Sequence, residues 1–126
     1  MTVTYTTAVK NDRMDAVSAA IDAGAGAGTL EIGTAGMAAV LVTFPLNDPS
    51  AAAAAGGVLT LSGLPKTQAA SGTGIAAAAR IRDSNSTDVV TGLTVGTSGA
   101  DIIIDNTSIS SGQDVNLNSG SITHAT

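Results

Sequence analysis

The shortage of large side chains is the feature that most constrains this chain. Among 126 residues the only aromatic ones are Tyr5 and Phe44, and cysteine is absent. Aromatic side chains bury about 150–250 Å² each and dominate many cores, so this core must consist of Val, Ile, Leu and Ala. Small domains with modest cores gain stability from disulfides, metals or association with other chains. The absence of cysteine excludes disulfides, and a single histidine, His124, excludes the usual zinc sites, so association is the expected route.

The charge balance argues against nucleic acid as a partner, and the short apolar runs argue against a membrane. Five Lys and Arg residues stand against ten Asp and Glu, which gives a net charge of −5. Binding to a phosphate backbone requires clustered basic side chains. No apolar run approaches the roughly 20 residues of a membrane span, and the first residues do not resemble a signal peptide. We therefore expect a protein made in a cytoplasm, with no cofactor.

Hydrophobic periodicity predicts one helix followed by short strands. Apolar residues recur at helical spacing over 7–23, with Thr6 or Thr7 as N-cap and Gly24 as the stop. This apolar stripe packs either on the domain's own sheet or on a partner. Seven or eight short strands follow at roughly ten-residue spacing, over 30–33, 39–44, 58–62, 76–83, 89–95, 101–105 and 113–123. A helical turn is expected over 51–55.

These elements predict a mainly β fold: an antiparallel β-sandwich, jelly-roll-like sheet or barrel with one N-terminal α-helix. The predicted domain organisation is an extended N-terminal arm over residues 1–6 and a single β-sandwich domain over 7–126 that includes the helix. The arm alternates Thr and apolar residues, which is typical of an extended segment. Such an arm either binds a neighbouring subunit or is loose, and the sequence leaves both open.

We find no constellation that predicts catalysis. A nucleophile needs a base within reach and an orienting group, and the only histidine lies two residues from the end. The glycine-rich run 24–28 follows a helix instead of preceding one, so it does not fit a dinucleotide-binding loop. Asp83, Asn85 and Asp88 have oxygen atoms that Ca²⁺ binds, but the glycine and the final glutamate of an EF-hand are missing. We expect a capped surface turn there, no metal, and no enzymatic activity.

The order of segments resembles a family of small virion structural proteins of tailed bacteriophages. The resemblance covers nearly the whole chain and rests on the segments 7–17, 30–32, 46–49, 51–61, 79–84 and 96–106, followed by Ile109, 111–113 and Val115. The stretch 96–106, with Ile109, 111–113 and Val115 after it, is the most similar. The chain departs from the family pattern at Gly33, where an aromatic residue is expected, and at the small residues 119–121.

The resemblance implies a capsid decoration, or cement, protein. Its partners would be the major capsid protein and copies of itself, as a trimer on the capsid exterior of the virion. The residues expected to contact the capsid are those of the arm: Thr2, Val3, Thr4 and Tyr5. An extended arm can add a strand to a partner's sheet.

Two other functions remain open. A neck, collar or tail component of the virion fits the same resemblance, and only copy number separates it from a decoration protein. A carbohydrate-binding module fits a small β-sandwich, but such modules usually present exposed aromatic rings to sugars. With only Tyr5 and Phe44 available, we rank this function third.

Overall fold

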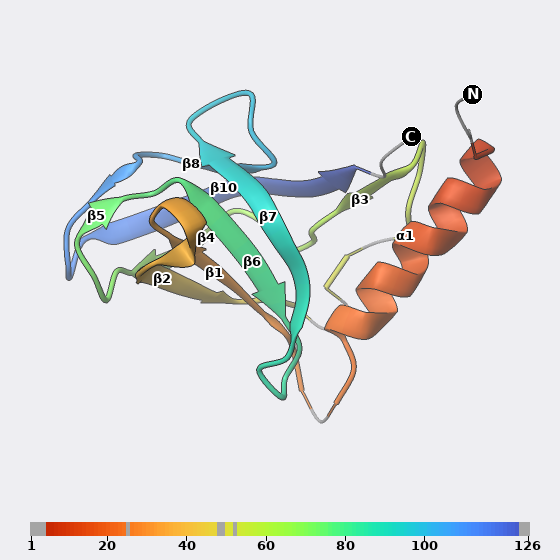
Figure 1. The fold of residues 1–126 in the computed structure, drawn as a ribbon, viewed down its shortest axis with the longest axis horizontal. Coiled ribbons are helices and arrows are strands. Elements are labelled where there is room, and N and C mark those ends of the chain that lie inside the picture. Colours follow the sequence, from red (N-terminus) through yellow and green to blue (C-terminus); the bar gives the residue numbers. More distant parts are fainter. Residues whose placement is uncertain (1–4, 25, 48–49, 52, 124–126) are drawn as a thin grey trace.

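The structure, a computed structural model, describes residues 5–24, 26–47, 50–51 and 53–123. One α-helix precedes a curled sheet, so the predicted mainly β class is confirmed (Figure 1). The elements are α1 (Thr7–Ile21), β1 (Thr29–Gly33), the 3₁₀ turn η1 (Ala35–Met37), β2 (Val40–Pro45), β3 (Val58–Thr60), β4 (Lys66–Ala69), β5 (Gly74–Ile75), β6 (Ala78–Arg82), β7 (Asp88–Gly96), β8 (Ile102–Ile104), β9 (Ser108–Ile109) and β10 (Asp114–Thr123).

Helix α1 begins where the sequence predicts. Thr6 is extended, and its hydroxyl accepts a hydrogen bond from the Val9 N–H at 3.4 Å, so it is the N-cap. The helix ends at Ile21, two residues before the predicted end, with Asp22 as C-cap. The Asp22 N–H donates to the Ser18 carbonyl at 3.0 Å and closes the last helical turn.

The alanine–glycine run after α1 makes a tight corner. Gly24 has a φ of +97°, a conformation that glycine adopts without strain. The Ser84 hydroxyl donates to the Ala23 carbonyl at 3.1 Å and ties this corner to the β6–β7 loop. A Cβ on Gly28 would lie 2.5 Å from the Arg82 carbonyl oxygen. The glycines therefore permit close packing between the chain leaving α1 and the strand β6.

Eight strands form one sheet in the order β2-β1-β6-β7-β8-β10-β3, with β4 also paired to β10. β5 and β9 form a separate two-stranded ribbon. The pairs are antiparallel except β7 with β8, which pair in parallel through Val95–Ile102 and Gly96–Ile103. The predicted antiparallel pattern therefore holds for the other strand pairs, and β7–β8 is the exception among the described strands. Between the two strands, residues 97–101 form a loop that returns the chain to the side of β7. β8 then runs in the same direction as β7 (Figure 1).

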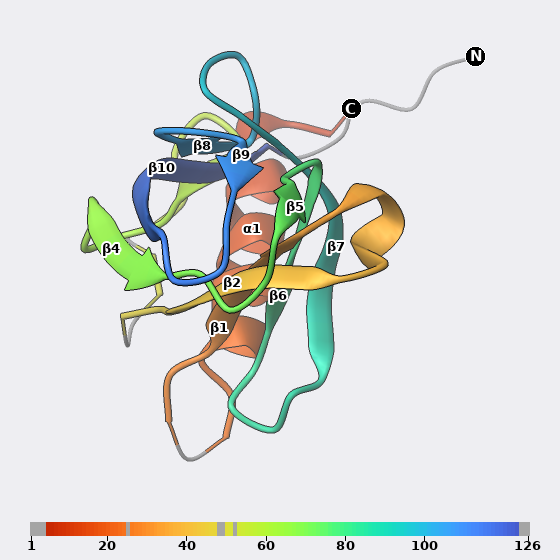
Figure 2. The same cartoon turned by 90° about the vertical axis from the view of Figure 1, so that its left-hand side faces the viewer.

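The sheet curls until its two edges approach each other. The Leu41 carbonyl oxygen on β2 accepts hydrogen bonds from Ser71 N at 2.8 Å and Gly72 N at 3.2 Å, just after β4. Lys66 at the start of β4 donates through Nζ to Asn47 Oδ1 at 2.8 Å. The result is a half-barrel with α1 at one end and the β5–β9 ribbon at the other (Figures 1 and 2).

The core lies inside this curled sheet and consists of aliphatic side chains. Leu30 and Ile32 on β1 and Ala79 and Ile81 on β6 are fully buried, and the residues between them face outward. On β2 both Leu41 and Val42 are fully buried, as are the other large members of the core: Ile21, Phe44, Leu59, Ile102, Ile104, Ile109 and Leu117. β2 is thus buried on both faces, as its continuous apolar run predicts.

Two local predictions differ from the structure. The segment 51–55 is not a helical turn. Ala51 and Ala55 form β-bridges to Leu61 and Val58, because the segment is held against α1 and β3 by tertiary contacts that override alanine's helix propensity. The short strands β4, β5 and β9 were not expected, since two to four residues cannot show a reliable alternation.

Candidate functional site

The predicted capsid-contact arm is described only at its last residue. Thr2, Val3 and Thr4 lie outside the described residues, whereas Tyr5 is placed directly before the helix cap. The Tyr5 side chain is 38% exposed, and the Arg13 guanidinium lies 4.7 Å from its ring centroid. This distance is within the range of a cation–π contact, which fixes the ring against the helix surface.

Tyr5, Val9 and Arg13 form one exposed patch at the start of α1. Val9 is 41% exposed, and the spacing of four residues places the three side chains on the same side of the chain as it enters the helix. We call this set the arm-root patch. It joins a tyrosine ring and an arginine, which are residue types enriched at the centres of protein interfaces, with an exposed valine beside them.

The opposite side of α1 docks on the half-barrel through polar groups as well as apolar ones. Met14 and Ile21 are buried. Between and beside them, Asn11 Oδ1, Asp15 Oδ1 and Asp22 Oδ1 accept hydrogen bonds from Gly57 N at 2.8 Å, Ala54 N at 2.8 Å and Ser50 N at 2.9 Å. The segment 50–57 is thus held to the helix by its backbone.

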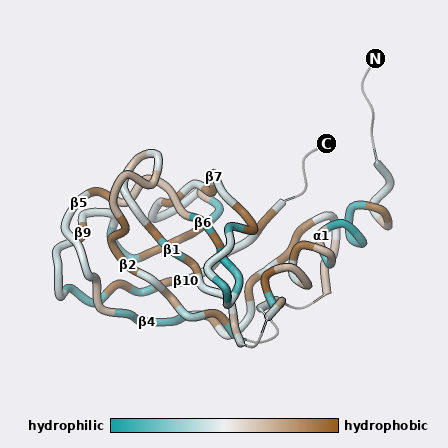
Figure 3. Tube along the Cα trace, turned by 60° about the horizontal axis from the view of Figure 1, so that its bottom comes forward, coloured by the Kyte–Doolittle hydropathy of each residue, from teal (hydrophilic) through white to brown (hydrophobic). Residues whose placement is uncertain are grey.

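The sequence did not lead us to predict this polar stripe of Asn11, Asp15 and Asp22. Asn11, Asp15 and Asp22 lie four and seven residues apart, which places them on one helix face. On a helix with a strong hydrophobic stripe, such polar residues would face solvent. In α1, polar and apolar residues are mixed along the whole helix, as its colours show (Figure 3). The spacing was visible, but nothing in it identified backbone N–H groups of residues 50–57 as partners.

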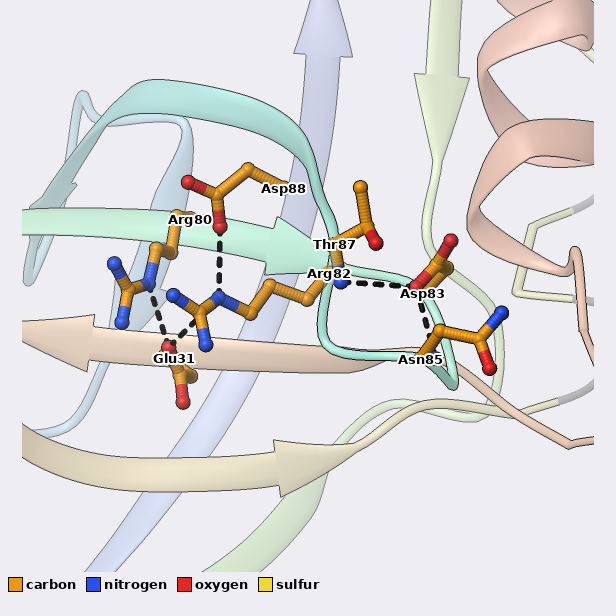
Figure 4. Close-up of polar contacts among 7 residues, drawn as sticks. All are labelled: Glu31, Arg80, Arg82, Asp83, Asn85, Thr87 and Asp88. Carbon is orange, nitrogen blue, oxygen red and sulfur yellow. Dashed lines mark hydrogen bonds and ion pairs between the residues drawn. The ribbon is translucent and has the colours of Figure 1, made fainter.

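Charged side chains cross the outer face of the sheet from β1 to β7 (Figure 4). Glu31 Oε1 lies 2.6 Å from Arg80 Nε and 3.6 Å from Arg82 Nε, and Arg82 Nε lies 2.7 Å from Asp88 Oδ1. The cluster follows from strand pairing, since Glu31 is in register with Arg80. Two guanidinium groups and two carboxylates balance in charge, so the cluster joins three strands and adds no net charge to the face.

The loop over residues 83–88, expected to be a capped surface turn, is one. Asp83 Oδ1 accepts hydrogen bonds from Asn85 N at 2.9 Å and Thr87 N at 3.0 Å. Asp88 turns away from Asp83 and pairs with Arg82 (Figure 4). The three oxygen ligands are therefore not gathered, and the described residues contain no group of three His, Cys, Asp or Glu side chains that could hold a metal ion.

The remaining features relevant to chemistry are few. His124 lies outside the described residues. The part of the chain that the structure describes contains no pocket, and none of its helices is long and apolar enough to cross a membrane. Phe44 is fully buried, so Tyr5 is the one aromatic ring at the surface, and it is engaged with Arg13. A platform of several rings for stacking on sugars is thus not available.

No protein-family model, no curated protein and no solved structure matches this chain. The structure itself defines the class: a mainly β protein with a curled, half-barrel sheet and one docked N-terminal helix. Its candidate functional feature is a surface, the arm-root patch.

Proposed function

We propose that this chain is a virion structural protein of a tailed bacteriophage, bound as a decoration protein on the outer surface of the capsid. In this role it stabilises the shell by contacts with the major capsid protein and with copies of itself, as a trimer. The observation that supports the proposal most is the arm-root patch, where Tyr5 and Val9 keep 38% and 41% of their side-chain area exposed.

The patch is well placed for docking an extended arm. It directly follows residues 2–4, which alternate Thr and Val and suit addition to the edge of a partner's sheet. The helix that carries the patch is held in place, because Met14, Ile21 and three side-chain hydrogen bonds fix α1 to the half-barrel. A preorganised contact loses less conformational entropy on binding.

Repetition would make modest contacts sufficient. A capsid displays many equivalent sites, and joined copies that bind together gain avidity without any new contact. The net charge of −5 suits a protein that faces solvent on the capsid exterior, since a DNA-facing protein needs basic side chains. The resemblance described above points to the same role.

The test is binding to capsids assembled without this chain. Wild-type protein is compared with a variant that lacks residues 2–5 and with one in which glycine and serine replace them at equal length. Thr6 is kept in both, because its hydroxyl caps α1. We expect the wild type to cosediment with capsids, and both variants to bind at least about tenfold more weakly with unchanged thermal unfolding.

If both variants bind capsids as tightly as the wild type, the arm does not contact the capsid. If the wild type itself does not bind, the proposal of a decoration protein is wrong. If only the shortened variant loses binding, the length of the arm matters but the Val3 and Tyr5 side chains do not.

A further inference from the structure

Charge is distributed unevenly along the half-barrel. Five charged residues lie on α1 and its C-cap: Lys10, Asp12, Arg13, Asp15 and Asp22. By contrast, three long segments carry no charged residue at all: 32–47, 67–79 and 106–113. Every residue in these three segments is described by the structure.

Hydrogen bonds bring the three uncharged segments together. Ala77 N donates to the Gly33 carbonyl at 2.9 Å, and Ala76 N donates to the Thr107 carbonyl at 2.8 Å. Ser111 N donates to the Thr73 hydroxyl at 3.0 Å. They meet around the β5–β9 ribbon at the end of the molecule opposite α1 (Figures 1 and 2). We call residues 34–39, 71–77 and 106–112 the neutral end.

Ile75 projects from the neutral end. It is 60% exposed, more than Tyr5 or Val9, the other exposed large hydrophobic residues of the described chain. The other exposed residues of the neutral end are Ala, Gly, Ser or Thr, with one amide, Asn106: Ala35, Gly36, Ala38, Ala39, Ser71, Thr73, Ala77, Asn106, Ser108, Ser110, Ser111 and Gly112. Ala and Gly lose almost no side-chain entropy on burial, unlike Lys, Arg or Glu.

We propose that the neutral end is the surface through which copies of this chain associate, with Ile75 as the apolar anchor. Interface cores are depleted of charged residues, and the neutral end carries none. This inference deepens the proposed function, because it assigns the contact between copies to a surface, but association of the purified chain does not depend on a capsid.

Three properties make a second copy the fitting partner. Each chain carries a net charge of −5, so copies repel wherever their acidic surfaces face each other, and the neutral end avoids that repulsion. Ser and Thr hydroxyls both donate and accept hydrogen bonds, which makes this surface complementary to itself. Ile75 is in register with Ser108 on the ribbon and both are exposed, so this pair offers a second copy an apolar contact beside a hydroxyl group.

The test is sedimentation velocity of the purified full chain over a wide range of concentrations. The wild type is compared with Ile75→Asp and with Ala19→Asp, which adds the same charge at an exposed residue of α1 outside the arm-root patch. We expect the wild type to sediment as a multiple of its 12.2 kDa chain. Ile75→Asp should raise the dissociation constant at least about tenfold, and Ala19→Asp should leave it unchanged.

Circular dichroism and thermal unfolding of both variants serve as the check on folding, since exposed substitutions alter stability little. A wild type that is monomeric at every concentration would overturn the inference. So would an Ile75→Asp variant that associates like the wild type, or an Ala19→Asp variant that dissociates in its place. A chain that self-associates through Ile75 but does not bind capsids would contradict the proposed function and leave this inference standing, whereas a monomer that binds capsids would do the reverse.

Discussion

At the scale of single residues, two side chains of α1 and that of its C-cap accept backbone N–H groups from the chain beside the helix. Asn11, Asp15 and Asp22 each accept one N–H, from Gly57, Ala54 and Ser50, and all three contacts are partly buried. A backbone N–H shielded from water costs free energy when it has no partner. These three contacts therefore stabilise the packing of Ser50, Ala54 and Gly57 beside the helix.

The first prediction concerns Asp15. Asp15→Ala removes the acceptor for the Ala54 N–H, 2.8 Å away, and should lower the free energy of unfolding by about 1–2 kcal/mol. Asp15→Asn keeps an oxygen acceptor and should recover part of that loss. Urea denaturation followed by circular dichroism measures both effects.

Asp12 supplies the matched control. It is an exposed acid on the same helix, so Asp12→Ala should change stability by no more than about 0.5 kcal/mol. Equal effects of Asp15→Ala and Asp12→Ala would mean that the bond to Ala54 does not stabilise the fold.

At the scale of elements, the strands β1, β6 and β7 are joined by apolar contacts inside the half-barrel and by ions outside it. Leu30, Ile32, Ala79 and Ile81 are fully buried, whereas the side chains of Glu31, Arg80 and Arg82 keep 16–25% of their area exposed. Ion pairs near water contribute less than buried hydrocarbon, because solvent and salt weaken them. The inner face should therefore account for most of the stability of this part of the sheet.

The ion cluster supplies the second prediction. Glu31→Gln removes the carboxylate that Arg80 and Arg82 share, and should lower the free energy of unfolding by about 1 kcal/mol or less at low salt. Molar salt should reduce this difference further, because screening is then nearly complete. Denaturant titrations at low and high salt measure it.

Asp114, an exposed acid at the start of β10, allows a control with the same change of charge. Asp114→Asn should have little effect at either salt concentration. A loss in Glu31→Gln well above about 2 kcal/mol that persists in molar salt would show that the cluster has a larger role than its exposure indicates.

The sequence predicts the elements whose pattern is long enough to read. The N-cap Thr6, the helix, and the strands β2, β6 and β10 follow from periodicity and capping chemistry. β4 and β9 were missed because strands of four and two residues depend on partners far along the chain: Asp114–Leu117 for β4 and Gly74–Ile75 for β9. Tertiary pairing also decides the conformation of Ala51 and Ala55, against their local preference.

The candidate surfaces were predictable only in part. The assignment of residues 2–5 as a capsid-contact segment stays a prediction; of these residues the structure describes Tyr5, which is 38% exposed. The contact of Tyr5 with Arg13 was not foreseen, since it depends on how the chain enters the helix. The neutral end is composed of three segments separated by more than 20 residues each. Only the fold brings them together around Ile75.

At the scale of the whole molecule, the two candidate surfaces lie at opposite ends of the half-barrel (Figure 1). The arm-root patch stands at the α1 end, and the neutral end surrounds β5 and β9. This separation lets one chain contact a shell through its arm and other copies through its neutral end at the same time. The modest aliphatic core gives a reason for both contacts, because a small core gains stability from association.

The central claim, a decoration protein on the capsid exterior, is tested most directly by copy number. Quantitative mass spectrometry of purified virions gives the ratio of this chain to the major capsid protein. The proposal predicts a ratio near one copy per capsid subunit, as expected for a protein that covers the shell. A ratio of a few copies per hundred subunits would place the chain in the neck, collar or tail, and its absence from virions would contradict a virion role altogether.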